Sequence, residues 1–314
     1  MKTSGYSIVV PVYFNEGSLL ALEAEIREKV FNQFTEHRGE IIFVDDGSQD
    51  NSYAVLEELH KGHPDDVRVV KLSRNFGQAN ALWCGFNFAP GAVIMISADG
   101  QDPVDLIPEM LRRHFGEGNE IVIARRESRE ESLFRRLSSR CAYWLMRHLY
   151  SAEMPLGGFD FLLLGNKSKS ALLETYQPNT FFQARILDLG FKRAWISYHR
   201  RDRLHGISKW TFRKKLTYLL DGVLGHSYLP IRLMSLVGAC FALTSFLLAA
   251  FFLMNYVVHG HELKGWTPII LSILFVGGVQ MVMIGIIGEY LWRVLAQVRQ
   301  SPPYIVEEVL DGRP

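Results

Sequence analysis

Two long apolar segments in the C-terminal third limit what this chain can fold into more than any other feature. Leu233–Val258 and Trp266–Gly288 carry no charged side chain. Each exceeds the roughly 20 apolar residues that cross the hydrocarbon core of a bilayer. A pair of buried core helices is the alternative, but core helices of this length with no charge on any face are uncommon. We therefore expect two transmembrane helices in a lipid bilayer.

Basic residues around these segments predict their orientation. The linker 259–265 holds only Lys264 as a full positive charge. The basic residues on the outer flanks are Arg213, Lys214, Lys215 and Arg232 before the segments and Arg293 and Arg299 after them. Because positive flanks stay in the cytoplasm, both termini are expected there, with the linker outside. Glycines in the second segment would allow close helix packing, within one chain or between subunits of a homo-oligomer.

The residues before these segments alternate between short β-branched apolar stretches and stretches with helical periodicity. The apolar stretches are "YSIVVPVY", "EIIFVDD", "VRVVKLS", "VIMIS" and "EIVIAR". Short strands separated by helices predict an α/β fold with a mainly parallel sheet that is covered on both faces. In such sheets, ligands bind beyond the carboxyl ends of the strands.

Polar clusters fall at those strand ends. The first four strands are followed by "NE", "DDGS", "SRNFGQ" and "SADGQD". Any one of these is consistent with a solvated turn, but four at one edge of the sheet indicate a binding site. The sequence lacks a Gly-x-Gly-x-x-Gly after the first strand and a Gly-Lys-Ser/Thr loop, which disfavours a Rossmann dehydrogenase and a P-loop NTPase. With 34 basic and 33 acidic residues, a general nucleic-acid binder is also disfavoured.

The motifs "VVPVYFNEGSL", "IIFVDDGSQDNS", "LSRNFGQANAL" and "SADGQDP", in this order and spacing, resemble the inverting family 2 glycosyltransferases of the GT-A type. The basic stretch "RLHGISKW" and the paired apolar segments narrow the resemblance to polyprenyl-phosphate glycosyltransferases, which include dolichyl-phosphate mannose synthases and bacterial bactoprenol glycosyltransferases. The resemblance covers nearly the whole chain. It implies an enzyme of the bacterial plasma membrane that moves one sugar from a nucleotide-sugar to polyprenyl phosphate at the cytoplasmic leaflet, with inversion.

The resemblance implies a donor site at the strand ends. The residues expected to hold the nucleotide are Pro11, Tyr13, Asn15 and Glu16, with Asp45 and Asp46 on the base and ribose. Asp99 is expected to be a catalytic metal ligand for Mg²⁺ or Mn²⁺, helped by Gln101. Most such enzymes carry Asp where this chain has Ser97, so one negative charge near the cation is lost. Because the donor's phosphates supply further oxygens, we expect a metal–phosphate site that binds metal more weakly without the donor.

The resemblance also implies an acceptor site with one acid among basic residues. Asp160, in "GGFDFLLL", matches the acidic catalytic position near the sugar and acceptor, although Leu162 replaces an Arg of the family pattern. The residues that match phosphate-binding positions are Arg126, Arg135, Ser139, Arg203 and Lys209. A lipid phosphate is already anionic and needs basic side chains to position it more than a strong base. Asp160 is therefore expected to orient the sugar or acceptor, with the role of general base left open.

The expected organisation is a cytoplasmic GT-A domain over 1–210, a juxtamembrane amphipathic segment over 211–230, two transmembrane helices over 231–298 and a cytoplasmic tail over 299–314. Residues 132–150 are expected to form an interfacial helix. Basic residues before the first span have a second interpretation, the binding of anionic headgroups. Two other functions stay open: a polysaccharide synthase, whose usual Gln-x-x-Arg-Trp motif is absent here, and a non-catalytic membrane scaffold that retains the fold.

Overall fold

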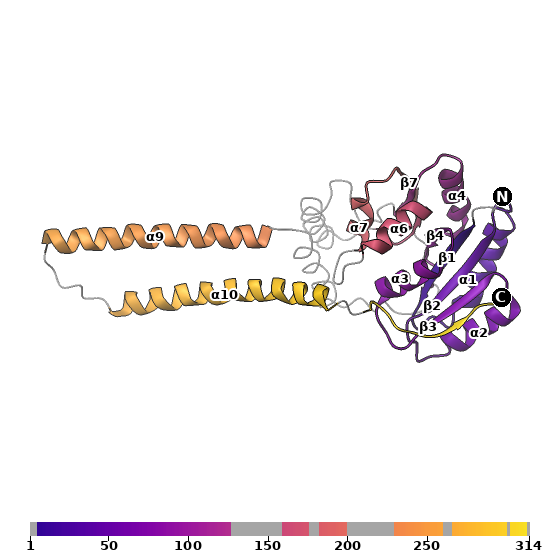
Figure 1. Cartoon of the computed structure of the whole chain (residues 1–314), viewed down its shortest axis with the longest axis horizontal. Coiled ribbons are helices and arrows are strands. Elements are labelled where there is room, and N and C mark those ends of the chain that lie inside the picture. The colour runs from indigo at the N-terminus through magenta and orange to yellow at the C-terminus, as the bar shows by residue number, and fades with distance from the viewer. Residues whose placement is uncertain are drawn as a thin grey trace. The chain divides into compact units, whose positions relative to one another are not determined.

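The chain divides into two units, which are drawn in Figure 1. The first comprises residues 1–219 and 302–314, and the second comprises residues 220–301. The computed structural model describes residues 5–126, 159–175, 182–199, 229–259, 266–299 and 302–312.

The described part of the first unit is built on one eight-stranded sheet with the order β7-β5-β6-β4-β1-β2-β3-β8. The strands are β1 (Tyr6–Val12), β2 (Gly39–Asp45), β3 (Val67–Leu72), β4 (Ala92–Met95), β5 (Ile121–Arg126), β6 (Leu162–Leu164), β7 (Arg193–Tyr198) and β8 (Val306–Leu310). Strands β6 and β8 run opposite to the other six. The predicted mainly parallel sheet is confirmed, and the carboxyl ends of the six parallel strands meet at one edge.

Helices cover both faces of this sheet (Figure 1). They are α1 (Leu19–Ile26) with its continuation η1 (Arg27–Phe31), α2 (Ser52–Gly62), α3 (Gln78–Phe88), η2 (Val104–Leu106), α4 (Ile107–Phe115), α6 (Asn166–Glu174) and α7 (Phe182–Asp188). Side chains alternate between faces along a strand, so Ile8 and Val10 pack with α1, α2 and α4. Val9 packs on the other face with α3, α6 and α7. A Cβ at Gly85 would overlap the Val9 side chain, so a glycine lets α3 lie close to β1.

The strand β8 brings the C-terminal segment back to the sheet. It pairs antiparallel with β3 at the edge, and the N–H of Ser73 donates to the carbonyl of Ile305 at 3.0 Å. Side chains strengthen this edge, since Arg68 and Asp311 form an ion pair at 3.0 Å. The sequence pattern predicted only a tail over 299–314, whereas residues 306–310 form a strand of the eight-stranded sheet.

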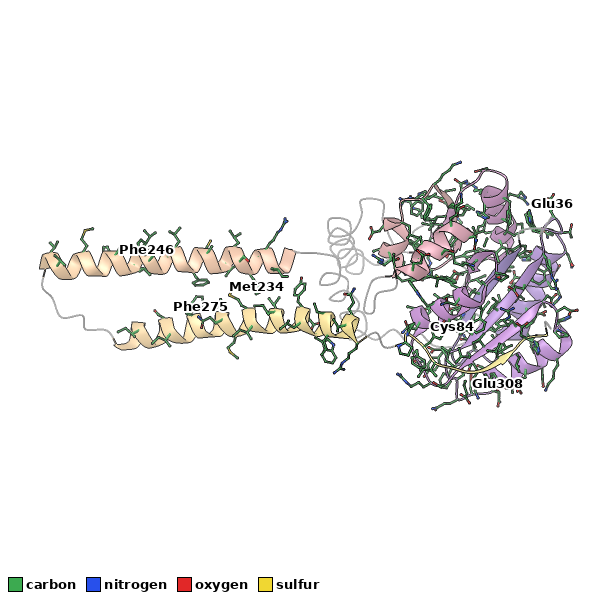
Figure 2. The ribbon with its side chains drawn as sticks, viewed as in Figure 1. Glu36, Cys84, Met234, Phe246, Phe275 and Glu308 are labelled. Carbon is green, nitrogen blue, oxygen red and sulfur yellow. The ribbon has the colours of Figure 1, made fainter. Side chains whose placement is uncertain are left out.

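The second unit contains two long helices, α9 (Leu229–His259) and α10 (Trp266–Val298). Both are long and apolar enough to cross a membrane by length and composition. Figure 2 shows their side chains, and Phe246 and Phe275 are more than half exposed. The helices touch where the rings of Phe241 and Phe275 lie 5.4 Å apart. The two predicted apolar helices are present, and at 31 and 33 residues each is about 45–50 Å long.

Candidate active site

The loops after β1 and β2 are tied to each other at the carboxyl edge of the sheet. The backbone N–H of Asn15 donates to the hydroxyl of Ser52 at 2.9 Å. The backbone N–H of Asn51 donates to the carboxylate of Glu16 at 2.9 Å. Two of the predicted donor residues thus hold the loops together, and Pro11 lies half-buried near the end of β1. Because of these bonds, the two loops form one continuous surface.

An exposed aromatic pair stands on this surface. The rings of Tyr13 and Phe14 meet edge to face at 4.5 Å, and both side chains are more than one-third exposed. Phe14 has a φ of 58°, which a bulky residue rarely adopts, and its N–H donates to the Ser48 hydroxyl at 3.2 Å. Tyr13 was predicted from the motif. No sequence signal marks Phe14, because its backbone strain depends on the neighbouring loop.

The carboxylate of Asp46 holds the loop between β3 and α3. It accepts the backbone N–H of Phe76 at 2.7 Å and that of Gly77 at 2.9 Å. It also accepts the side-chain amide of Asn75 at 2.9 Å. Burial raises the pKa of this carboxyl to about 6. The described contacts of Asp46 are therefore with the protein's own loop, and its predicted contact with the nucleotide stays a prediction.

Asp45 differs from its neighbour in having an unsatisfied oxygen. Its Oδ2 accepts the backbone N–H of Ser48 at 3.2 Å, whereas its buried Oδ1 has no hydrogen-bond partner among the residues that the structure describes. Burial raises the pKa of this carboxyl as well. A buried carboxylate oxygen without a donor is energetically costly. Because Asp45 is fully buried, its predicted contact with the base or ribose stays a prediction.

A hydrogen-bonded chain begins in the loop after β4. The Ser97 hydroxyl lies 2.8 Å from Oδ1 of Asp99 and 2.6 Å from Oδ2 of Asp102. The hydroxyl of Tyr198, at the end of β7, donates to the other oxygen of Asp102 at 2.9 Å. Asp102 is only 1% exposed, so these hydroxyls replace the water that a carboxylate needs. The chain reaches from the predicted metal ligand to the far side of the sheet edge.

The series of hydrogen bonds continues from Tyr198 to the predicted acceptor residues Arg126 and Asp160. Nε of Arg126 donates to the Tyr198 hydroxyl at 3.2 Å, and its Nη2 donates to Oδ2 of Asp160 at 2.6 Å. The side-chain amide of Gln183, on α7, donates to Oδ1 of Asp160 at 3.1 Å. Burial acts to lower the pKa of Arg126, but the charge of Asp160 and the Tyr198 hydroxyl raise it above its ordinary value. Arg126 therefore remains a cation, held in one orientation.

The donor atoms around Asp99 suit a cation that also binds a phosphate. Within the part of the chain that the structure describes, no three His, Cys, Asp or Glu side chains are grouped to hold a metal ion. Oδ1 of Asp99 accepts the backbone N–H of Gln101 at 3.2 Å. Mg²⁺ is usually held by one or two carboxylates together with substrate phosphates. The residues present fit a metal whose remaining ligands come from the donor's phosphates, and the predicted weaker metal binding without the donor stays a prediction.

Four predicted residues, Arg135, Ser139, Arg203 and Lys209, lie outside the described residues, as does the segment 132–150. Three residues of the hydrogen-bonded chain were not predicted. Asp102 lies inside the quoted motif "SADGQDP" and could have been found there. Tyr198 and Gln183 carry no sequence signal, because only the tertiary fold brings β7 and α7 beside β5.

A mainly parallel sheet with acidic loops at its carboxyl edge defines a GT-A-like α/β fold. The profile of glycosyl transferase family 2 matches residues 7–164. The chain belongs to this family and is a glycosyltransferase, which confirms the resemblance drawn from the motifs.

Two relatives align over nearly the full chain. The uncharacterized glycosyltransferase YkcC of Bacillus subtilis is 33% identical over 96% of this chain and 93% of its own. The SfII prophage-derived bactoprenol glucosyl transferase of Shigella flexneri is 31% identical over 98% of this chain and 99% of its own. Among solved structures, a mannosyltransferase of Pyrobaculum calidifontis in complex with GDP-Man and Mn²⁺ is 16% identical, with a TM-score of 0.46 over 62% of this chain and 55% of that one.

Proposed function

We propose that this protein is a membrane-anchored glycosyltransferase that moves one sugar from a nucleotide-sugar to polyprenyl phosphate, with inversion. The observation that carries the proposal is the hydrogen-bonded chain that joins the acidic loop of Asp99 to the Arg126–Asp160 pair at one edge of the sheet. In this proposal a donor diphosphate lies at the Asp99 end of the hydrogen-bonded chain and a second anion lies at the Arg126 end. The bactoprenol glucosyl transferase that aligns over 98% of the chain supports the same acceptor class.

In this proposal the nucleotide-sugar binds across the ends of β1 and β2. The exposed rings of Tyr13 and Phe14 offer an apolar face to a planar base. The unsatisfied oxygen of Asp45 accepts a hydrogen bond from the base or ribose. Asn15 and Glu16 keep these loops in place through their contacts with the β2 loop.

Asp99, with Gln101 nearby, would hold Mg²⁺ or Mn²⁺ jointly with the donor's phosphates. A bound divalent cation would neutralise the charge that develops on the leaving diphosphate. The acceptor phosphate is placed by Arg126, and by Arg135, Ser139, Arg203 and Lys209 as the motifs predict. One of its oxygens attacks the anomeric carbon as the bond to the diphosphate breaks on the opposite face. Since that oxygen carries no proton, Asp160 orients the sugar and Arg126 and does not need to act as a base.

The two apolar helices α9 and α10 serve as the membrane anchor. We propose the bacterial plasma membrane, with residues 1–210 and both termini in the cytoplasm and the short linker outside. Residues 211–230 then lie at the cytoplasmic interface. The glycines of α10, among them Gly277 and Gly278, have open space around them and would permit a second helix, from another subunit, to approach closely.

A transfer assay tests the proposal. The purified full chain in detergent is incubated with Mn²⁺, undecaprenyl phosphate and a panel of nucleotide-sugars, and the lipid product is analysed by mass spectrometry. We expect one added sugar from one donor, with the opposite anomeric configuration by NMR. A protein that binds a nucleotide-sugar but transfers nothing to the lipid would contradict the proposed acceptor. Repeated addition of sugars would indicate a polysaccharide synthase.

A further inference from the structure

We infer that Tyr198 and Asp102 are positioning residues that couple the donor side of the site to the acceptor side. The inference rests on the proposed function, because it concerns how the two halves of that site are held in register. The Tyr198 hydroxyl is the central link. It donates to Asp102 at 2.9 Å and accepts from Arg126 at 3.2 Å. A phenol has one hydrogen to donate, and here that hydrogen is directed to Asp102.

The next link passes this geometry to Asp99. Ser97 has one hydroxyl hydrogen, yet its oxygen lies within hydrogen-bond distance of carboxylates on both Asp99 and Asp102. The two carboxylates therefore compete for the Ser97 hydrogen. When Tyr198 donates to Asp102, the Ser97 hydrogen is available to Asp99. A change at Tyr198 is transmitted in this way to the carboxylate of Asp99, which lies in a different loop of the sheet edge.

At its other end, the hydrogen-bonded chain contacts the residues of the acceptor side. Arg126 is bonded to both Tyr198 and Asp160, and Asp160 is bonded in turn to Gln183. The residues that would meet the acceptor phosphate and those that would meet the donor diphosphate are thus linked by contacts within hydrogen-bond distance, with the single Ser97 hydrogen shared between Asp99 and Asp102. A phosphate bound at the donor end or the acceptor end is expected to fix the side chains at the opposite end in their binding orientation. Binding of one substrate should therefore favour binding of the second.

The first experiment needs no turnover. Mn²⁺-dependent binding of UDP, GDP, dTDP and ADP is measured by calorimetry on the full chain in detergent, and the tightest nucleotide is kept as the probe. Tyr198→Phe retains the ring that packs at right angles to Phe161, 6.1 Å away, and loses only the hydroxyl. Without the Tyr198 hydroxyl, Asp102 takes the Ser97 hydrogen and Asp99 loses the contact that orients it, so the dissociation constant is expected to be about three- to tenfold higher. Tyr6→Phe is the matched control, since the buried Tyr6 hydroxyl has no hydrogen-bond partner within the described part of the chain. Tyr6 also begins β1, at the end of the strand opposite the candidate site.

An unchanged dissociation constant in Tyr198→Phe would overturn the inference, because two independent half-sites predict that result. An equal loss in Tyr6→Phe would also overturn it, since the effect would then be one of core packing. Melting temperatures of both variants, measured in parallel, separate loss of folding from loss of coupling. Failure of the wild type to bind any of the four nucleotides with Mn²⁺ would overturn the inference and the donor site together.

The second experiment is a double-mutant cycle on transfer. Ser97→Ala, at the donor end, is expected to raise the KM for undecaprenyl phosphate about threefold, which a purely local role of Ser97 does not predict. In the Tyr198→Phe background, the same substitution should have a smaller effect, because the connection is already broken. If the KM of the double variant changes by the product of the two single-variant changes, the coupling is refuted. A wild type that transfers no sugar would overturn the proposed function, while the nucleotide-binding experiment would still decide the inference.

Discussion

The carboxylate of Asp46 accepts the backbone N–H of Phe76 at 2.7 Å and so ties the loop after β3 to the end of β2. Burial raises the pKa of this carboxyl to about 6, compared with about 4 in an unfolded chain. The folded protein therefore binds this proton more tightly than the unfolded chain does. The stability that the group contributes is present below about pH 4 and is lost as the pH rises through about 6.

Asp46→Asn removes this titration. Relative to the variant, the wild type is expected to lose up to about 3 kcal/mol of stability between pH 4 and pH 6.5. Melting temperatures of both proteins in detergent, measured at half-unit steps of pH, check the prediction. The difference between the two curves should change across this window and become level above it. Parallel curves throughout would show that Asp46 does not titrate there.

Asp99→Ala is expected to lower transfer by about a hundredfold or more, because a cation at a leaving phosphate is worth several kcal/mol. EDTA should have the same effect on the wild type. The measurement is initial rate with and without added Mn²⁺. Asp105→Ala is a suitable control, since Asp105 is exposed and pairs with Lys29 on the surface. Full activity in EDTA, or in the Asp99 variant, would refute metal dependence.

Ser97→Asp restores the acid that the family pattern contains and is expected to tighten Mn²⁺ binding in the absence of donor. Residue 97 lies between Asp99 and Asp102, so a third carboxylate there should also lower the melting temperature of the metal-free protein. Added Mn²⁺ should recover that loss. The test is a Mn²⁺ titration of both proteins by calorimetry. Equal or weaker affinity in the variant would show that residue 97 does not face the metal.

Arg203→Ala is expected to weaken use of polyprenyl phosphate and leave donor binding nearly unchanged. A charge-assisted contact with phosphate is worth roughly 1.5–3 kcal/mol, so the acceptor KM should rise about tenfold or more. Donor dissociation constant and acceptor KM are measured in detergent. The alternative role of Arg203, binding of anionic lipid headgroups, predicts that the variant has normal kinetics in detergent and reduced membrane association. A large loss of donor affinity with an unchanged acceptor KM would move this residue to the donor diphosphate.

The edge strand β8 offers a matched pair of substitutions. Val306 packs against the buried cluster beneath α3, whereas Val309 is 38% exposed. Val306→Asp is expected to cost about 1–3 kcal/mol, because it places a polar group against apolar side chains. Val309→Asp should stay within about 0.5 kcal/mol. Melting temperature and donor affinity are the readouts. Equal effects of the two variants would show that the packing of Val306 against the core does not stabilise the sheet.

The sheet, and the strand ends at which the candidate site is placed, could be predicted from sequence because both depend on local patterns. β-branched stretches separated by amphipathic stretches predict parallel strands, and parallel strands bring "DDGS" and "SADGQD" to one edge. The roles of Asp45 and Asp46 could not be distinguished, since two adjacent acids look alike in a sequence. Their difference lies in the loop of Phe76, which satisfies one carboxylate and leaves an oxygen of the other without a partner.

Tyr198, Gln183 and β8 could not be predicted, for a common physical reason. Each acts through a partner that is distant along the chain: Tyr198 meets Asp102, Gln183 meets Asp160, and β8 meets β3. No local periodicity encodes such pairings. The stretch "VEEVL" is also short and carries two adjacent glutamates, which made it indistinguishable from a solvated tail.

The pairing of β8 with β3 has a consequence for how the protein is made. The ribosome completes β3 early, but its partner strand emerges only after both apolar helices, which takes roughly ten to fifty seconds at usual rates of synthesis. During that time the N–H and C=O groups along the outer side of β3 have no strand to pair with, a state that invites association with other chains. Synthesis of both helices therefore precedes closure of the sheet, and a chain that ends within the second helix lacks the strand that completes this edge.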